Sequence, residues 1–227
     1  MGKGKKAGIG VGTAAALALC APISRGVALD VVADKVISSE ATSQEKVIED
    51  AIHNAYGADM RVRCLGQGAI NMRLWPVGKD LNTIYGYAVP LLNNIWMDQD
   101  VCNKVTAFAA SQEKELTNGD TVHALGVVAH EAAHHVNWTF NEGTAQCEAV
   151  QMVDKLSLAL GATPAVAHEM RERLGGMILK DMESVAPTSA GQLRPPQEYD
   201  LVDCYDGGPH DLDPDTPGFF PQTKEPK

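Results

Sequence analysis

The sequence predicts an α+β fold, in which a small and mainly antiparallel sheet is followed by helices and by an irregular C-terminal tail held by a disulfide. Short segments of alternating apolar residues lie in the first half of the chain, and longer segments of helical period lie in the second half. After Pro187 the composition shifts to Pro, Gly and Asp, which is typical of irregular structure. These shifts predict a leader over residues 1–28, one domain over 29–187 and a tail over 188–227.

The expected elements follow one another along the domain. The first helix is expected over residues 44–56, with Ser43 or Ser39 as its N-cap and Gly57 at its end. Four short segments have the pattern of strands: 60–65, 70–75, 84–89 and 94–97. Helical periods then predict four more helices: 100–112, 122–136, 142–160 and 163–185. Asp120 or Thr121 is expected to cap the helix over 122–136.

The N-terminal segment has the organisation of a secretory signal peptide. Lys3, Lys5 and Lys6 precede an apolar, Ala-rich stretch over residues 9–23, and small residues follow. The sequence therefore predicts an exported protein, with an uncleaved N-terminal membrane anchor as the alternative. Removing residues 1–28 takes away four basic residues and no acidic one, which leaves 15 basic against 29 acidic residues. Such an acidic chain is not expected to bind nucleic acid.

Four cysteines lie outside the leader, an even number that suits two disulfides in an exported protein. Three pairings are possible. We favour Cys64 with Cys102, because they flank the strand-rich half, and Cys147 with Cys204, which would tie the tail to the helix over 142–160. No two of them are spaced as Cys-x-x-Cys, so a zinc site made of cysteines is not expected.

The helix over 122–136 contains the string His130-Glu131-Ala132-Ala133-His134. Residues four apart in a helix lie one turn apart on one face, so both histidines can direct a ring nitrogen toward one metal ion. Glu131 projects near the same edge and can reach a water molecule beside the metal without binding the metal. This spacing indicates two zinc ligands and a general base.

A catalytic zinc site needs a third protein ligand. The residue six positions after His134 is Phe140, which cannot bind a metal, and His135 points about 100° around the helix from His134. Glu142 and Glu148 remain, and they lie on different faces of the next helix. We favour Glu142 and keep Glu148 as the alternative.

The segment 141–146, Asn-Glu-Gly-Thr-Ala-Gln, resembles the Asn-Glu-x-x-x-Asp segment of thermolysin-like peptidases, which belong to the gluzincin branch of the zincins. The resemblance covers only the short stretch that holds the two motifs. It implies a zincin-like fold and a Zn²⁺ ion bound by His130, His134 and Glu142. It also implies that Glu131 activates water for peptide hydrolysis.

Two departures from the family pattern stand out. Gln146 occupies the place of the family's acidic residue, and it could still hydrogen-bond a ligand histidine. The gap between His134 and Glu142 is shorter than in the family, which requires a chain reversal directly after the helix. Asn137 is expected to adopt the positive φ of that reversal, and Asn141 is expected to cap the next helix.

Thermolysin-like peptidases stabilise the oxyanion with histidine and tyrosine side chains from beyond the ligand helices. By residue type, and by the expected disulfide at Cys204, the candidates here are Tyr199, Tyr205 and His210. The sequence thus predicts an exported, monomeric zinc peptidase that acts on peptide or protein substrates. The alternative is a metal-binding zincin-like module at the cell surface that does not cleave.

Overall fold

The computed structural model describes residues 40–66, 85–111 and 119–184. In this part of the chain, a helix is followed by a three-stranded sheet and then by further helices. The expected leader (1–28), the expected strand over 70–75 and the expected tail (188–227) lie outside the described residues. An α+β order is therefore confirmed for the described part of the domain.

The sheet contains β1 (Arg61–Leu65), β2 (Gly86–Val89) and β3 (Asn94–Asp98) in the order β1-β3-β2. β3 runs antiparallel to β2 but parallel to β1. The prediction of a mainly antiparallel sheet is therefore wrong, because the sheet is mixed. A short 3-10 turn, η3 (Pro90–Leu92), makes β2 and β3 an antiparallel hairpin, and β1 pairs in parallel with the free edge of β3. Alternation along a strand predicts its faces but not the direction of its neighbour.

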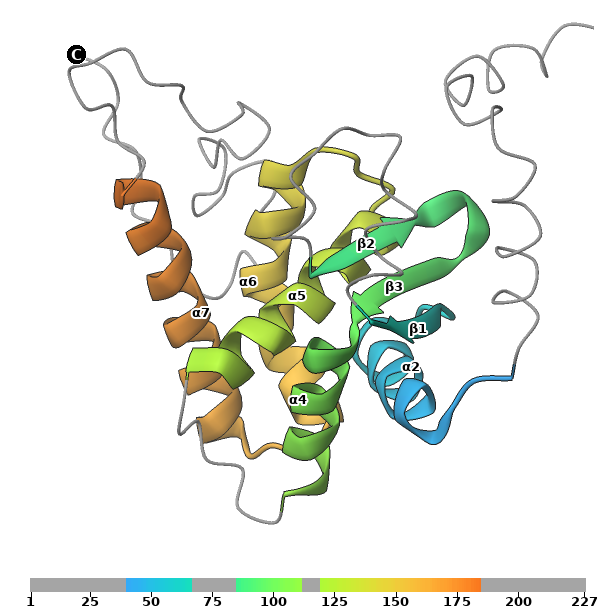
Figure 1. The fold of residues 1–227 in the computed structure, drawn as a ribbon. Coiled ribbons are helices and arrows are strands. Elements are labelled where there is room, and N and C mark those ends of the chain that lie inside the picture. Colours follow the sequence, from blue (N-terminus) through green and yellow to red (C-terminus); the bar gives the residue numbers. More distant parts are fainter. Residues whose placement is uncertain (1–39, 67–84, 112–118, 185–227) are drawn as a thin grey trace, which may run out of the picture.

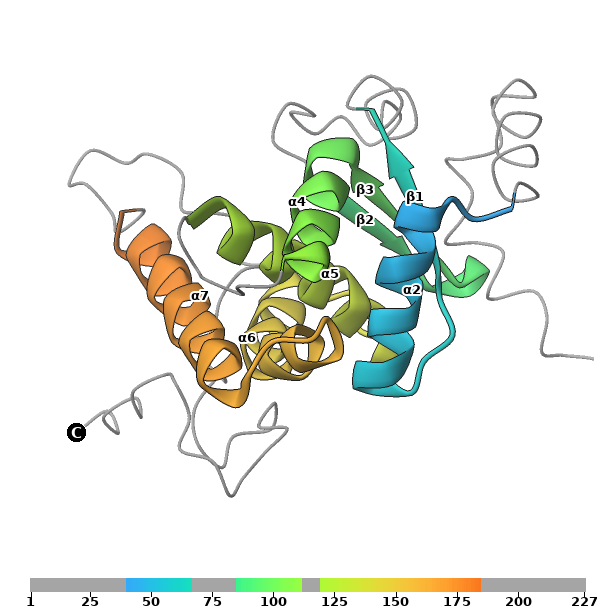
Figure 2. The ribbon, with the colours of Figure 1, turned by 90° about the horizontal axis from the view of Figure 1, so that it is seen from below.

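Helices cover the sheet and extend the core away from it (Figures 1 and 2). α2 (Ser43–Tyr56) packs on β1, α4 (Gln99–Ala110) packs on β3, and α5 (Gly119–Val136) packs on β2. α6 (Glu142–Ala159) contacts α2, α5 and α7 (Pro164–Ser184). Val62, Ile95 and Met97 of the sheet are fully buried, and they belong to the same core cluster as residues of all five helices.

The observed helix ends confirm some of the predicted caps and contradict others. Thr42, and neither Ser43 nor Ser39, caps α2: its hydroxyl accepts the N–H of Glu45, whose carboxylate accepts the N–H of Thr42. Gly57 ends α2 with a φ of 68°, as expected. α5 begins at Gly119, so the expected caps Asp120 and Thr121 lie inside its first turn. Asn141 caps α6, as predicted.

Two carboxylates of α2 complete the outer edge of the sheet at β1. Glu45 accepts the N–H of Cys64 and Glu49 accepts the N–H of Val62, each over 2.9 Å. The buried Arg63 guanidinium lies 3.6 Å and 3.9 Å from these two carboxylates. A backbone N–H at a sheet edge needs a partner when it is shielded from water, and side chains of α2 supply it here.

The disulfide between Cys64 and Cys102 is confirmed, and it joins β1 to α4. It closes a separation of 38 residues along the chain, for which chain entropy suggests a stabilisation of about 4 kcal/mol. The other favoured pair, Cys147 with Cys204, includes a residue outside the described part of the chain. The disulfide thus fixes the sheet to a helix on its covered face.

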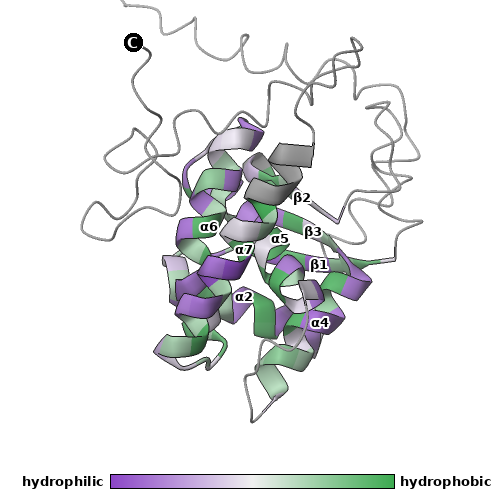
Figure 3. Ribbon diagram, turned by 90° about the vertical axis from the view of Figure 1, so that its left-hand side faces the viewer, coloured by the Kyte–Doolittle hydropathy of each residue, from purple (hydrophilic) through white to green (hydrophobic). Residues whose placement is uncertain are grey.

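The surface helices mix hydrophilic and hydrophobic residues along their lengths, as Figure 3 shows for α4 and α7. This pattern is expected of helices that bury one side against a core. None of the described helices is both long and apolar enough to cross a membrane.

Candidate metal centre

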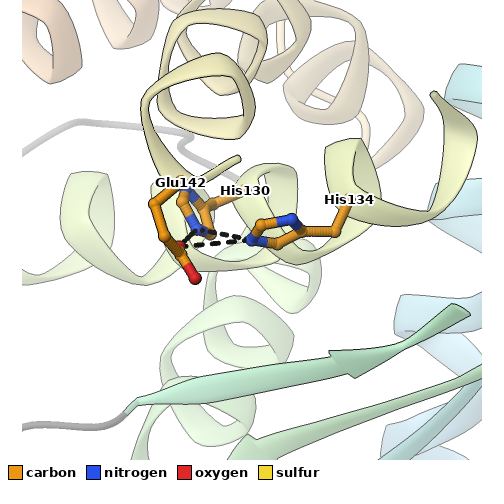
Figure 4. Close-up of side chains that lie close together, drawn as sticks. All are labelled: His130, His134 and Glu142. Carbon is orange, nitrogen blue, oxygen red and sulfur yellow. Dashed lines mark hydrogen bonds and ion pairs between the residues drawn. The ribbon is translucent and has the colours of Figure 1, made fainter. Parts of the chain in front are cut away.

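Two helices bring together the residues of the predicted metal site. His130 and His134 lie one turn apart on α5, with their ring centroids 4.7 Å apart. Glu142 is the first residue of α6, and the Asn141 cap fixes where that helix begins. The three side chains point toward one another, two from α5 and one from α6 (Figure 4). The structure therefore assembles one ligand atom from each of them within 4.8 Å.

The three ligand atoms form a small triangle. The Nε2 atoms of His130 and His134 are 3.1 Å apart, and they lie 3.0 Å and 3.3 Å from Oε2 of Glu142. Ligands of a tetrahedral zinc ion, at bond lengths of about 2.0–2.1 Å, are separated by about 3.3 Å. The dimensions of this triangle fit three corners of such a tetrahedron, so the three residues could hold a metal ion.

The charges of the three groups complement one another. Burial alone would raise the pKa of the Glu142 carboxyl, but hydrogen bonds from His130 and His134 hold that pKa far below its usual value. Burial lowers the pKa of His134, but its bond to Glu142 and the negative charge of Glu131 outweigh burial and raise the pKa overall. The Glu142 carboxylate therefore stays charged, and together with Glu131 it favours a positive charge at this point.

The other ring nitrogen of His134 is also engaged. Its Nδ1 lies 2.8 Å from the carbonyl oxygen of Thr139, in the connection between α5 and α6. Gln146, the predicted partner of a ligand histidine, makes no such bond in the described part of the chain. A main-chain carbonyl takes that place, and Thr139 was not among the expected site residues.

Glu131 lies against the edge strand β2. Its side chain is buried and accepts a hydrogen bond from the backbone N–H of Ala88. The N–H of Asp98 donates to the carbonyl of Tyr85, so the backbone groups of Tyr85 face β3. Hydrogen-bonded and non-hydrogen-bonded positions alternate along an antiparallel pair, so the backbone groups of Gly86 and Ala88 point away from β3. The outward edge of β2 thus runs beside the predicted general base.

Gly86 is required for this close approach. A Cβ atom at this position would lie 2.8 Å from Cγ and 2.9 Å from Oε1 of Glu131. A glycine within a strand often marks such an approach, so Gly86 was a signal in the sequence that could have identified β2 as part of the site. Glu131 is a residue of α5, and β2 restricts the position of its side chain.

Burial is the main reason why the pKa of Glu131 is raised, and the charge of Glu142 adds to the effect. The two histidines and the N–H of Ala88 act in the opposite direction. A carboxyl whose pKa is raised above its usual value is a stronger base than an ordinary glutamate. Tyr87 shares this environment: burial raises its pKa, and the charges of Glu131 and Glu142 raise it further. Sequence reasoning did not single out Tyr87.

The alternative ligand Glu148 lies in a different place. It is 4% exposed, and its Oε2 accepts a hydrogen bond of 2.7 Å from the side-chain amide of Asn137. The ligand group found in the described residues consists of His130, His134 and Glu142. His135 is also buried, which lowers its pKa, and its ring lies 6.4 Å from that of Trp138.

The reversal after α5 occurs one residue later than predicted. Trp138 has a φ of 51°, whereas Asn137 is not among the described residues with positive φ. The N–H of Asn137 still bonds to the carbonyl of Ala133, so the helical path continues through Asn137 and the turn moves to Trp138. A bulky residue in this conformation costs about 1–3 kcal/mol and is found where the surrounding structure imposes it.

Comparisons with protein-family models, with curated proteins and with solved structures find no match to this chain. The candidates Tyr199, Tyr205 and His210 lie outside the described residues, so the structure does not place them. The case for function therefore depends on the geometry of the site itself.

Proposed function

We propose that this protein is an exported zinc-dependent peptidase that hydrolyses peptide bonds with Glu131 as its general base. One observation carries the proposal: the triangle formed by His130, His134 and Glu142 has the dimensions of a zinc site, and the buried Glu131 stands beside it. A purely structural metal site needs ligands but has no use for such a carboxylate. The signal-like residues 1–28 support export.

The donor set supports zinc over other common ions. Two imidazoles and one carboxylate suit zinc, whereas calcium and magnesium prefer sites made of oxygen ligands. Three protein ligands with a fourth open position are typical of catalytic zinc, while structural zinc sites are closed by four. His130, His134 and Glu142 would therefore hold the ion and leave room for water and substrate.

Zinc, when bound, supplies a Lewis acid that lowers the pKa of water and polarises a carbonyl group. Glu131 takes the proton from the attacking water and later gives it to the amine that leaves. The N–H of Ala88 holds the Glu131 carboxylate in place. The raised pKa of Glu131 suits this side chain both to taking the proton from water and to giving it to the amine. Hydrolysis then proceeds without a covalent bond between the enzyme and the substrate.

The edge strand offers a way to orient a peptide. The N–H of Ala88 is donated to Glu131, but the carbonyl of Ala88 and the backbone groups of Gly86 also point away from β3, and extended peptides can bind to a sheet edge by adding a strand. We therefore expect an extended peptide as substrate, bound along β2 with a peptide bond near the ligand triangle.

Metal removal tests the proposal directly. The purified protein should contain one equivalent of zinc and cleave unstructured peptides from a mixed peptide library. Treatment with a strong chelator should abolish cleavage, and stoichiometric zinc should restore it. Zinc content is read by elemental analysis and cleavage by mass spectrometry of the products. Zinc without cleavage of any peptide would favour the non-catalytic module, and a folded protein without zinc would refute both functions.

Gly86→Ala should lower peptidase activity without removing zinc. The added methyl group would meet the Glu131 side chain, which can shift only by leaving its position beside the site. A displacement of about 1 Å can cost about 100-fold in rate. We therefore expect kcat to fall about 10- to 100-fold, with one equivalent of zinc retained.

Gly66→Ala is the matched control for this substitution. Gly66 follows β1, and a Cβ atom there would meet no atom within 4 Å. Its activity and zinc content should equal those of the parent. A Gly86→Ala protein with the parent kcat would show that the approach of β2 to Glu131 has no catalytic role.

A further inference from the structure

The connection between the two ligand helices follows one defined path. At its start the N–H of Asn137 bonds to the carbonyl of Ala133 over 3.2 Å. Near its end the hydroxyl of Thr139 accepts the N–H of Asn141 over 3.2 Å, and Asn141 caps α6. Between them lies Trp138 with its positive φ. This path decides where the carbonyl of Thr139 points.

A buried carboxylate ties this turn to α6. Glu148 lies in the second turn of α6 and is 4% exposed, and Asn137 donates its side-chain amide to it over 2.7 Å. Removing a carboxylate from water is unfavourable unless hydrogen-bond donors replace the water. Alanines occupy the buried α6 positions 145 and 149, so an apolar residue would also suit the interior. The presence of Glu148 thus points to a role in fixing Asn137.

The carbonyl of Thr139 determines the protonation pattern of His134. A carbonyl oxygen can only accept, so Nδ1 of His134 carries a proton and donates it. In the neutral ring, Nε2 then has a free lone pair that can bind a metal ion between His134, His130 and Glu142. A neutral imidazole without this partner has two tautomers, and one of them places the proton on the nitrogen that faces the metal.

We propose that Asn137 and Glu148 are positioning residues: their hydrogen bond holds the turn that aims the Thr139 carbonyl at His134, and so keeps Nε2 of His134 free for a metal ion. This inference rests on the proposed metal site, but its test does not require peptide cleavage. The strained Trp138 fits this role, because the turn is held by contacts at both ends and not by a residue suited to positive φ.

The experiment compares the full-length parent with Asn137→Ala, Glu148→Ala and Glu148→Gln. The tautomer of His134 is read from two-bond ¹H–¹⁵N correlation spectra of the metal-free proteins at alkaline pH. Zinc affinity is measured by competition with a chromophoric chelator. Both alanine variants should convert a single tautomer into a mixture and weaken zinc binding about 10- to 100-fold. Glu148→Gln keeps an oxygen that can accept from Asn137 and should retain both properties of the parent.

Asn141→Ala is the matched control, because it removes a second asparagine from the same turn and weakens the start of α6. It should retain the parent tautomer of His134. A mixture of His134 tautomers in Asn141→Ala would mean that any loosening of the turn disturbs the tautomer, and would overturn the proposal. An unchanged tautomer in Asn137→Ala would also overturn it, whatever the zinc affinity. Asn137 is exposed, so this variant remains informative even if Glu148→Ala does not fold.

Discussion

Glu131→Gln should slow peptide cleavage by about 10²- to 10⁴-fold while leaving zinc bound. The amide has the shape of the carboxylate and can still accept the N–H of Ala88, so the position of the side chain should be preserved. It cannot take up a proton from water at neutral pH. General acid–base groups contribute about 10²- to 10⁴-fold to the rate, so kcat should fall by about this factor.

The measurement is kcat against a cleaved peptide, together with zinc content by elemental analysis. One equivalent of zinc in Glu131→Gln shows that the ligand set is intact, so that the loss of rate belongs to the base. A variant that cleaves at the parent rate would remove Glu131 from the mechanism. If neither the parent nor Glu131→Gln cleaves peptides and both bind zinc, the protein is the non-catalytic metal-binding module.

Glu142→Ala should weaken zinc binding by more than any other single carboxylate substitution in the described part of the chain. It removes one corner of the ligand triangle and leaves only two histidines, which lie 3.1 Å apart at their Nε2 atoms. Loss of an outer hydrogen-bonding partner of a metal ligand typically costs about 10- to 100-fold in affinity. Loss of the ligand itself should exceed about 100-fold, as measured by chelator competition.

Glu148→Ala is the comparison that decides the third ligand. If Glu142 binds zinc and Glu148 holds Asn137, the Glu148 variant should lose less affinity than the Glu142 variant. The reverse order would move the third ligand to Glu148 and would contradict the geometry of the site. Circular dichroism of the metal-free variants checks that both proteins remain folded.

The sequence predicted the site more completely than it predicted the sheet. His130, His134 and Glu142 could be chosen because the spacing along a helix fixes which side chains share a face, and the Asn141 cap marks where the next helix starts. The parallel pairing of β1 with β3 was not predictable in this way, since it depends on which edge of the hairpin β1 joins.

The contacts around the three candidate ligands were not predicted from the sequence either. Thr139 acts through its backbone, and every residue type has a carbonyl, so no pattern marks it. Asn137 was expected at the positive φ, but its side chain bonds to Glu148 and Trp138 takes the strained conformation. Local preference was overridden here by contacts between two helices.

By itself, the sequence predicted the helices, the group of His130, His134 and Glu142 that could hold a metal ion, and the favoured pairing of Cys64 with Cys102, because these depend on local period, residue chemistry and spacing along the chain. Only the tertiary structure decided that β2 lies against Glu131, that Gly86 leaves room for this contact and that Thr139 meets His134. These contacts join segments that are distant along the chain or act through the backbone. Their energies arise only when the whole core is packed.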